Sequence, residues 1–237
     1  SMAVWPAKTL SDSDKSKLRS LALAYAEEVD CIGVCETRFG ISPDGSKITL
    51  LGISPRPGRD SIFIAPLVGV SLTSVAASLA VGLTLEETGI SVPEIEPTDV
   101  CAVKAGRFAF KKFLDADKTL GTSMKSVGEV IAIGSNFAEA FQKALRSLDI
   151  DHRVLGISGP GTFNDTADSG KLREMLATPT AERPYYLRAA LDLGLSIDEI
   201  SELTGIDKWY VERIQELAIF ESELIDKSLV EIGRAHV

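Results

Sequence analysis

The periodicity of the apolar residues changes near residue 150, and this change restricts the fold more than any other feature of the sequence. Before it, strand-like runs such as 31–41 and 47–53 alternate with helical segments. After it, apolar residues recur only at helical spacing. The sequence therefore predicts an α+β part at residues 1–150, a linker at 151–170 and an all-α part at 171–237.

Composition narrows the classes of protein to which the chain can belong. With 45% hydrophobic residues, the chain has enough apolar material for a packed core. The formal net charge of −9 disfavours binding to nucleic acid or to an anionic membrane surface. No apolar run is long enough to predict a transmembrane helix. We therefore expect a globular protein with no nucleic-acid partner and no membrane partner.

Two arginines follow a predicted β-hairpin. A turn at 43–45 joins the strand-like runs 31–41 and 47–53, and the loop after the second run carries Arg56 and Arg59. We call these two residues the arginine pair. Two arginines after a strand can hold a phosphate or carboxylate through bidentate hydrogen bonds, but two solvated surface arginines would show the same pattern.

Helical spacing predicts further elements on both sides of the change in periodicity. Apolar residues recur at helical spacing over 11–28, 68–81 and 137–148. In the C-terminal part, Ser196 and Glu199 have the spacing of a capping box, which predicts the start of a helix.

Residues 193–217 have the outline of a helix-turn-helix, with Gly205 in the turn. The second helix would read DNA, but its outward residues include Asp207, Glu212 and Glu216. Acidic residues oppose the electrostatic attraction that supplies most non-specific DNA affinity. An αα-hairpin inside a helical domain is therefore favoured, and nucleic-acid binding is a minor alternative.

Several stretches resemble the large chain of carbamoyl-phosphate synthetase, in the half that phosphorylates bicarbonate. They are VWPAKTLSD at 4–12, AASLAVGLTLEE at 76–87, EIEPTDVCAVKAGRFAFKKF at 94–113, MKSVGEVIAIGSNFAEAFQKALRSL at 124–148 and ELTGIDKWYVERI at 202–214. The fourth stretch is the most specific. The resemblance extends over nearly the whole chain and implies that 202–214 lies in an oligomerisation domain.

The resemblance implies the C-terminal part of the family's first ATP-grasp domain, an antiparallel-rich sheet with helices, followed by the start of its all-α oligomerisation domain. Members of the family are ligases that use ATP, Mg²⁺ or Mn²⁺ and K⁺ to form carbamoyl phosphate for pyrimidine or arginine biosynthesis. The implied partner is a second copy of the chain or the remainder of a synthetase. A cytoplasmic location is expected, with a mitochondrial one left open.

Three positions depart from the family's pattern. The family's cation-binding Gln is Arg38 here, its metal-bridging Glu is Gly52 and its metal-binding Asn is Ser54. Phosphoryl transfer from ATP needs divalent cations, and these hard cations need oxygen ligands. A guanidinium about 4 Å from such a cation would repel each unit of its charge by about 4 kcal/mol at an effective dielectric near 20.

We therefore expect no bound metal, no bound cofactor and no intact catalytic residue. The chain alone would be an inactive enzyme fragment or a non-catalytic scaffold derived from the family. Arg38 is expected to pair with an acidic neighbour, and the bulkier residues 60–63 replace small residues that border the family's ammonia route. The arginine pair is kept, and in the family these arginines hold the phosphate or carboxyphosphate, so a small anion could still bind there.

Overall fold

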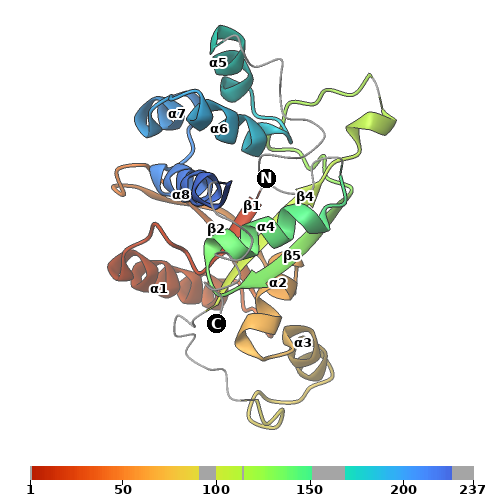
Figure 1. Cartoon of the computed structure of the whole chain (residues 1–237). Helices are drawn as coiled ribbons and strands as arrows, with labels where there is room; N and C mark the ends of the chain where they lie inside the picture. Colours follow the sequence, from red (N-terminus) through yellow and green to blue (C-terminus); the bar gives the residue numbers. More distant parts are fainter. Residues whose placement is uncertain (1, 91–99, 114, 151–168, 226–237) are drawn as a thin grey trace. The chain divides into compact units, whose positions relative to one another are not determined.

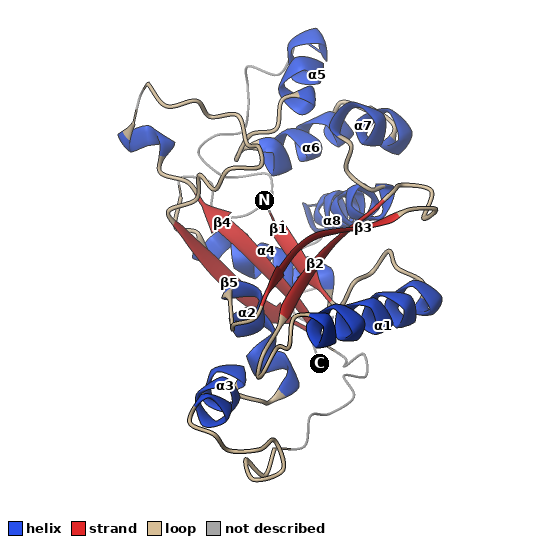
Figure 2. Cartoon of the chain, turned by 180° about the vertical axis from the view of Figure 1, so that it is seen from behind, coloured by secondary structure: helices blue, strands red, loops and turns tan. Residues whose placement is uncertain are grey.

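The computed structural model describes residues 2–90, 100–113, 115–150 and 169–225 (Figures 1 and 2). The chain forms two compact units. We call Trp5–Thr98 the hairpin unit, and Ser1–Val4 together with Asp99–Val237 the helical unit. Both strands and helices are present, so the predicted α+β class is confirmed.

The hairpin unit is built on an antiparallel pair of strands. Strand β2 (Glu36–Ile41) pairs with β3 (Ile48–Ser54), as the sequence predicts, and the turn between them contains Gly45 at a φ of 70°. Helix α1 (Asp12–Glu28) precedes the strands and is capped by Ser11, whose Oγ accepts a hydrogen bond from the amide of Asp14. Figure 2 shows the two strands and α1.

The helix predicted over 68–81 is present, but it begins later than predicted, and a separate helix that the sequence pattern did not predict comes before it. Helix α2 (Arg59–Val68) ends at Gly69, whose φ of 68° is the left-handed conformation that terminates many helices. Helix α3 (Leu72–Ala80) then begins after its cap, Ser71. No single described helix has the length and hydropathy expected of a membrane span. Helices α2 and α3 reach these values only when taken together, and the chain bends by 113° between them.

A three-stranded sheet opens the helical unit. Its strand order is β1 (Met2–Trp5), β4 (Cys101–Arg107) and β5 (Gly128–Gly134), and β4 runs antiparallel to β5. Helix α4 (Phe137–Ser147) packs against β4 and β5 (Figure 1). A 3₁₀ turn at Phe110–Lys112 lies in the long connection between the two strands.

Four helices complete this unit: α5 (Ser169–Ala177), α6 (Arg183–Asp192), α7 (Ile197–Thr204) and α8 (Lys208–Ile225). Ser196 caps α7 through a hydrogen bond from the amide of Glu199, as the sequence predicts. Gly205, with a φ of 67°, ends α7, and Asp207 Oδ1 accepts from the amide of Trp209 at the start of α8.

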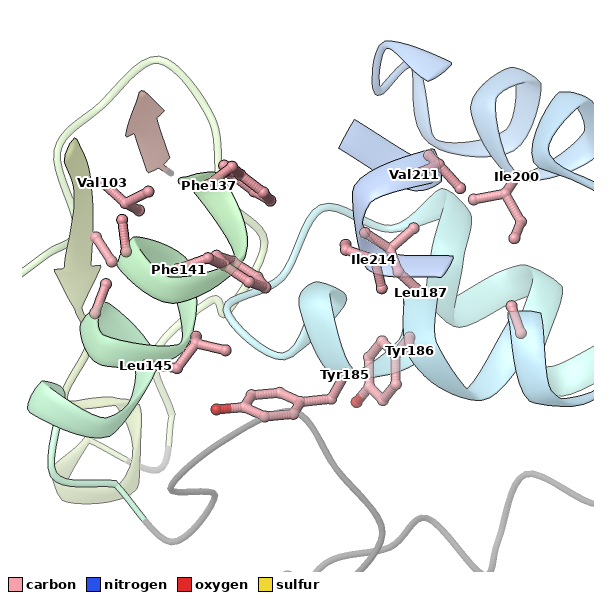
Figure 3. Close-up of a cluster of buried hydrophobic side chains, with 14 of the residues drawn as sticks. Val103, Phe137, Phe141, Leu145, Tyr185, Tyr186, Leu187, Ile200, Val211 and Ile214 are labelled. Atoms are coloured by element: carbon pink, nitrogen blue, oxygen red, sulfur yellow. The ribbon is translucent and has the colours of Figure 1, made fainter. Parts of the chain in front are cut away.

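One hydrophobic core joins the sheet, α4 and the four C-terminal helices (Figure 3). Phe137 stacks on Phe141 at 5.1 Å and meets the edge of Trp209 at 5.3 Å. Side chains from both sides of residue 150 therefore share this core, although the composition changes there. Residues 151–168, most of the predicted linker, lie outside the described residues, and the three-part division at 150 and 170 stays a prediction.

Candidate functional site

The residues predicted to form the site lie at one end of the β2–β3 hairpin and in the loop after it. Arg38 on β2 is the direct cross-strand partner of Gly52 on β3. Ser54, the last residue of β3, is paired in the same way with Glu36. The register therefore brings together the three positions at which the chain departs from the family's metal ligands.

Arg38 contacts Asp60, a residue in the first turn of α2. The distance from Arg38 Nη2 to Asp60 Oδ2 is 3.5 Å, so the expected acidic neighbour of Arg38 is Asp60. The two side chains are 73% and 45% exposed, and an ion pair this open to solvent contributes less than about 1 kcal/mol. What matters more is where the guanidinium of Arg38 lies. It puts a positive charge at the position where the family resemblance predicts the side-chain amide of a cation-binding Gln.

Glu36 is the residue of this site that the sequence did not reveal. Its Oε1 accepts hydrogen bonds from the amide of Gly58 at 2.7 Å, the amide of Ser61 at 2.9 Å and the hydroxyl of Ser61. A carboxylate at a helix N-terminus is stabilised by unpaired amides and by the helix dipole. Because its partners are 22 and 25 positions away, no local pattern could have identified Glu36.

Gly58 allows this arrangement because the carboxylate of Glu36 lies directly against its Cα. A Cβ at position 58 would be 2.5 Å from Glu36 Oε2, which is far inside van der Waals contact. Gly58 is the N-cap of α2 and has extended backbone dihedrals, so the requirement for glycine is steric. Ser61, which is 5% exposed, donates to Oε1 of the same carboxylate from both its amide and its hydroxyl.

A divalent metal does not fit these residues. Position 52 has no side chain, and the two carboxylates of the region are engaged, Glu36 by the start of α2 and Asp60 by Arg38. Across the described part of the chain, no three His, Cys, Asp or Glu side chains gather as metal ligands would. Hard cations such as Mg²⁺ need several oxygen ligands, and both carboxylates here already have a hydrogen-bond or ion-pair partner.

The arginine pair lies beside this helix start. Arg56 is exposed in the loop, and Arg59, also exposed, is the first residue of α2. A helix N-terminus usually assists anion binding through its free amides. Here Glu36 already occupies the amides of Gly58 and Ser61, so an anion at the arginine pair would depend on the guanidinium groups.

The helix-turn-helix outline corresponds to the αα-hairpin of α7 and α8. Lys208 Nζ lies 2.7 Å from Asp198 Oδ1, and Arg213 Nη2 lies 2.7 Å from Glu216 Oε1. These ion pairs neutralise the cations that DNA phosphates would need. Val211 of α8 is fully buried in the core, which fits a hairpin packed inside a helical domain.

Two family models match the chain. Residues 1–88 match the carbamoyl-phosphate synthase L chain, ATP binding domain, and residues 129–235 match the carbamoyl-phosphate synthetase large chain, oligomerisation domain. The first range contains the hairpin and the arginine pair. The second begins in β5 and includes α4 to α8.

Relatives are more than a third identical to this chain over the aligned residues. It is 39% identical over 231 residues to a carbamoyl phosphate synthase large chain of Archaeoglobus fulgidus, covering 94% of this chain and 21% of the relative. It is also 39% identical to a carbamoyl phosphate synthase large chain, N-terminal section, of Methanopyrus kandleri. That alignment covers 95% of this chain and 41% of the relative. A biotin carboxylase domain of a single-chain bacterial carboxylase superposes with a TM-score of 0.43 at 16% identity, covering 94% of this chain and 50% of that one.

The two family models and the two large chains name the same family. The chain spans about a fifth of the length of the Archaeoglobus relative and about two fifths of the Methanopyrus relative. The structural likeness to the carboxylase domain is too low to assign a function. The two domain models lie in the order expected from the sequence motifs, and the resemblance predicted from those motifs is confirmed. The chain therefore belongs to the carbamoyl-phosphate synthetase large-chain family.

Proposed function

We propose that this chain is a non-catalytic part of a carbamoyl-phosphate synthetase large chain, in which the site at Arg38 and Gly52 has lost metal-dependent phosphoryl transfer. The observation that carries the proposal is the cross-strand pairing of these two residues, with the guanidinium held at Asp60. A positive charge and a missing side chain stand at two of the positions where the family pattern has oxygen ligands.

The electrostatics of the site favour an anion over a cation. Three arginines, Arg38 and the arginine pair, outnumber the two carboxylates of Glu36 and Asp60. Magnesium would have to compete with the guanidinium of Arg38 for Asp60, and it would find no second free carboxylate among these residues. Without the cation, nothing bridges the β- and γ-oxygens of ATP and neutralises their charge.

Calorimetry tests this proposal directly. Titration of the chain with ATP in the presence and absence of Mg²⁺ is expected to give no Mg²⁺-dependent heat. A micromolar, Mg²⁺-dependent isotherm would refute it. Inorganic phosphate serves as the matched probe for the arginine pair, because it needs no metal: weak binding that is lost in Arg56→Ala would support the remaining anion site.

The alternative is an enzyme fragment that takes part in carbamoyl phosphate formation for pyrimidine or arginine biosynthesis. Family membership favours it, since the relatives are named as synthase large chains. The purified chain is expected to form no carbamoyl phosphate from bicarbonate, ammonia and Mg·ATP. Product above a no-enzyme control would favour this alternative over the scaffold.

The helical unit supports self-association, which would take place in the cytoplasm. The match of 129–235 to an oligomerisation domain motivates this part of the proposal, and Ile219 and Phe220 on α8 are 53% and 57% exposed. Exposed large apolar neighbours of this kind are typical of interfaces. Light scattering is expected to show a dimer or larger assembly that Phe220→Glu weakens. A monomeric mass at high concentration would contradict it.

A further inference from the structure

An apolar cavity of about 490 Å³ lies inside the helical unit. Figure 3 shows two of its walls: Phe137 and Phe141 project from α4, and Leu187 and Ile214 lie opposite them on α6 and α8. Val4 of β1 also lines it. This volume lies within the range of natural small-molecule sites, which are mostly apolar with a few placed polar groups.

A backbone hydrogen bond joins two segments that line the cavity. The amide of Leu120 donates to the carbonyl of Pro179 at 2.6 Å, which ties the connection between β4 and β5 to the connection between α5 and α6. Leu120, Gly121 and Pro179 all line the cavity. Two segments of the lining are therefore tied to one another.

Two residues that line the cavity each carry a polar atom that is buried without a hydrogen-bond partner in the described part of the chain. These atoms are Thr180 Oγ1 and Arg183 Nε. The other nitrogens of Arg183 are used: Nη1 donates to the carbonyl of Thr204 at 3.2 Å and Nη2 to that of Ala177 at 2.9 Å. A buried donor without an acceptor costs about 1–3 kcal/mol, so both atoms favour a ligand with an acceptor group.

The charge of Arg183 defines that acceptor. Its guanidinium bonds only to neutral carbonyls in the described residues, and its burial lowers its pKa, which reports loss of solvation without a compensating anion. The one acidic residue in the lining, Asp207, is exposed, and its carboxylate already accepts from the amide of Trp209. A carboxylate is the acceptor that best matches a guanidinium.

We propose that this cavity binds a small amphipathic monocarboxylate. The hydrocarbon part of the ligand packs against Phe137, Phe141, Leu187 and Ile214, and its carboxylate accepts hydrogen bonds from Arg183 Nε and Thr180 Oγ1. The site is independent of the hairpin unit and of the proposed loss of metal binding. The helical unit would then bind a small ligand in addition to its proposed role in self-association.

Octanoate and its uncharged counterpart 1-octanol are suitable probes for the full chain. Calorimetry is expected to show one saturable site that binds octanoate at least tenfold more tightly than 1-octanol. Trp209 provides a second readout, since its ring is 5.3 Å from that of Phe137 in the cavity wall. The chain has two tryptophans, so Trp5→Phe leaves Trp209 as the only one.

Three variants separate this site from non-specific binding. Thr180→Val removes the hydroxyl at nearly constant volume and is expected to weaken octanoate binding several-fold while leaving 1-octanol unchanged. Thr178→Val is the matched control, because Thr178 is exposed, bonds to the carbonyl of Glu174 and does not line the cavity. Arg183→Met keeps the apolar stem and is expected to make the two probes bind equally.

Arg183→Met also removes two hydrogen bonds to carbonyls, so its fold is checked by circular dichroism. If it does not fold, Thr180→Val against Thr178→Val decides the question. The proposal is overturned if the unmodified chain shows no saturable octanoate site, if 1-octanol binds as tightly as octanoate, or if Thr180→Val binds octanoate as Thr178→Val does.

Discussion

Replacing Gly58 with alanine should dislodge Glu36 from the start of α2. The new Cβ would be 2.5 Å from Glu36 Oε2, and ordinary van der Waals contact begins at 3.4 Å, so the carboxylate must retreat by about 0.9 Å. The hydrogen bonds from the amides of Gly58 and Ser61, now 2.7 and 2.9 Å, would then exceed the 3.5 Å limit. Loss of a charged cap of this kind costs about 2 kcal/mol.

A double-mutant cycle isolates this mechanism. In a Glu36→Ala background there is no carboxylate to displace, so Gly58→Ala should cost only the difference between glycine and alanine as a cap, about 0.5 kcal/mol. The coupling free energy between the two sites is therefore expected to exceed about 1 kcal/mol. Among the described residues of the hairpin unit, only Ser61, Phe63 and Val75 are buried. Because this core is small, loss of the cap should measurably lower the free energy of unfolding.

The assay is urea denaturation of the four proteins, combined with amide hydrogen exchange of α2. Denaturation gives the free energy of unfolding, and exchange shows whether the loss is local to this helix. We expect Gly58→Ala and Glu36→Ala each to speed the exchange of α2 amides, with little further effect when they are combined. Additive effects within about 0.5 kcal/mol would refute the reasoning.

Three further predictions concern the helical unit. Lys143 hydrogen-bonds to Glu139 and lowers the pKa of that carboxyl from 4.5 to about 2. The stabilisation from this pair is therefore present above pH 4.5 and is lost as pH falls toward 2. Urea midpoints measured across this pH range should depend less on pH in Glu139→Gln than in the unmodified chain. Phe141→Ala should cost about 3–5 kcal/mol in urea denaturation, because the side chain is 2% exposed in the core. Burial raises the pKa of Tyr185 to about 12, so an ultraviolet titration of Tyr185→Phe should lack one late phenolic transition.

Local patterns predicted most elements of this fold correctly. The hairpin followed from two strand-like runs and a Pro-Asp-Gly turn, and α7 followed from the spacing of Ser196 and Glu199. Such signals act between residues close in sequence, where propensity and capping dominate. The apolar run at 68–81 located α3 but placed its start too early, because Gly69 ends α2 and Ser71 caps α3 within the run.

Long-range contacts set the features that the sequence did not reveal. Glu36 reaches Gly58 across 22 positions, and Asp60 reaches Arg38 across the same separation. The cavity in the helical unit depends on how α4, α6 and α8 pack, which no single segment encodes. Family resemblance predicted the positions of Arg38 and Gly52 in a common site, but only the strand register places them opposite one another.

The most direct test of the central claim is manganese binding measured by electron paramagnetic resonance. The unmodified chain is compared with Arg38→Gln/Gly52→Glu/Ser54→Asn, which restores the family's oxygen ligands at the three departing positions. We expect free Mn²⁺ to be undiminished by the unmodified chain and reduced stoichiometrically by the triple variant. Bound Mn²⁺ in the unmodified chain, at a site whose signal disappears in Gly52→Arg, would contradict the account.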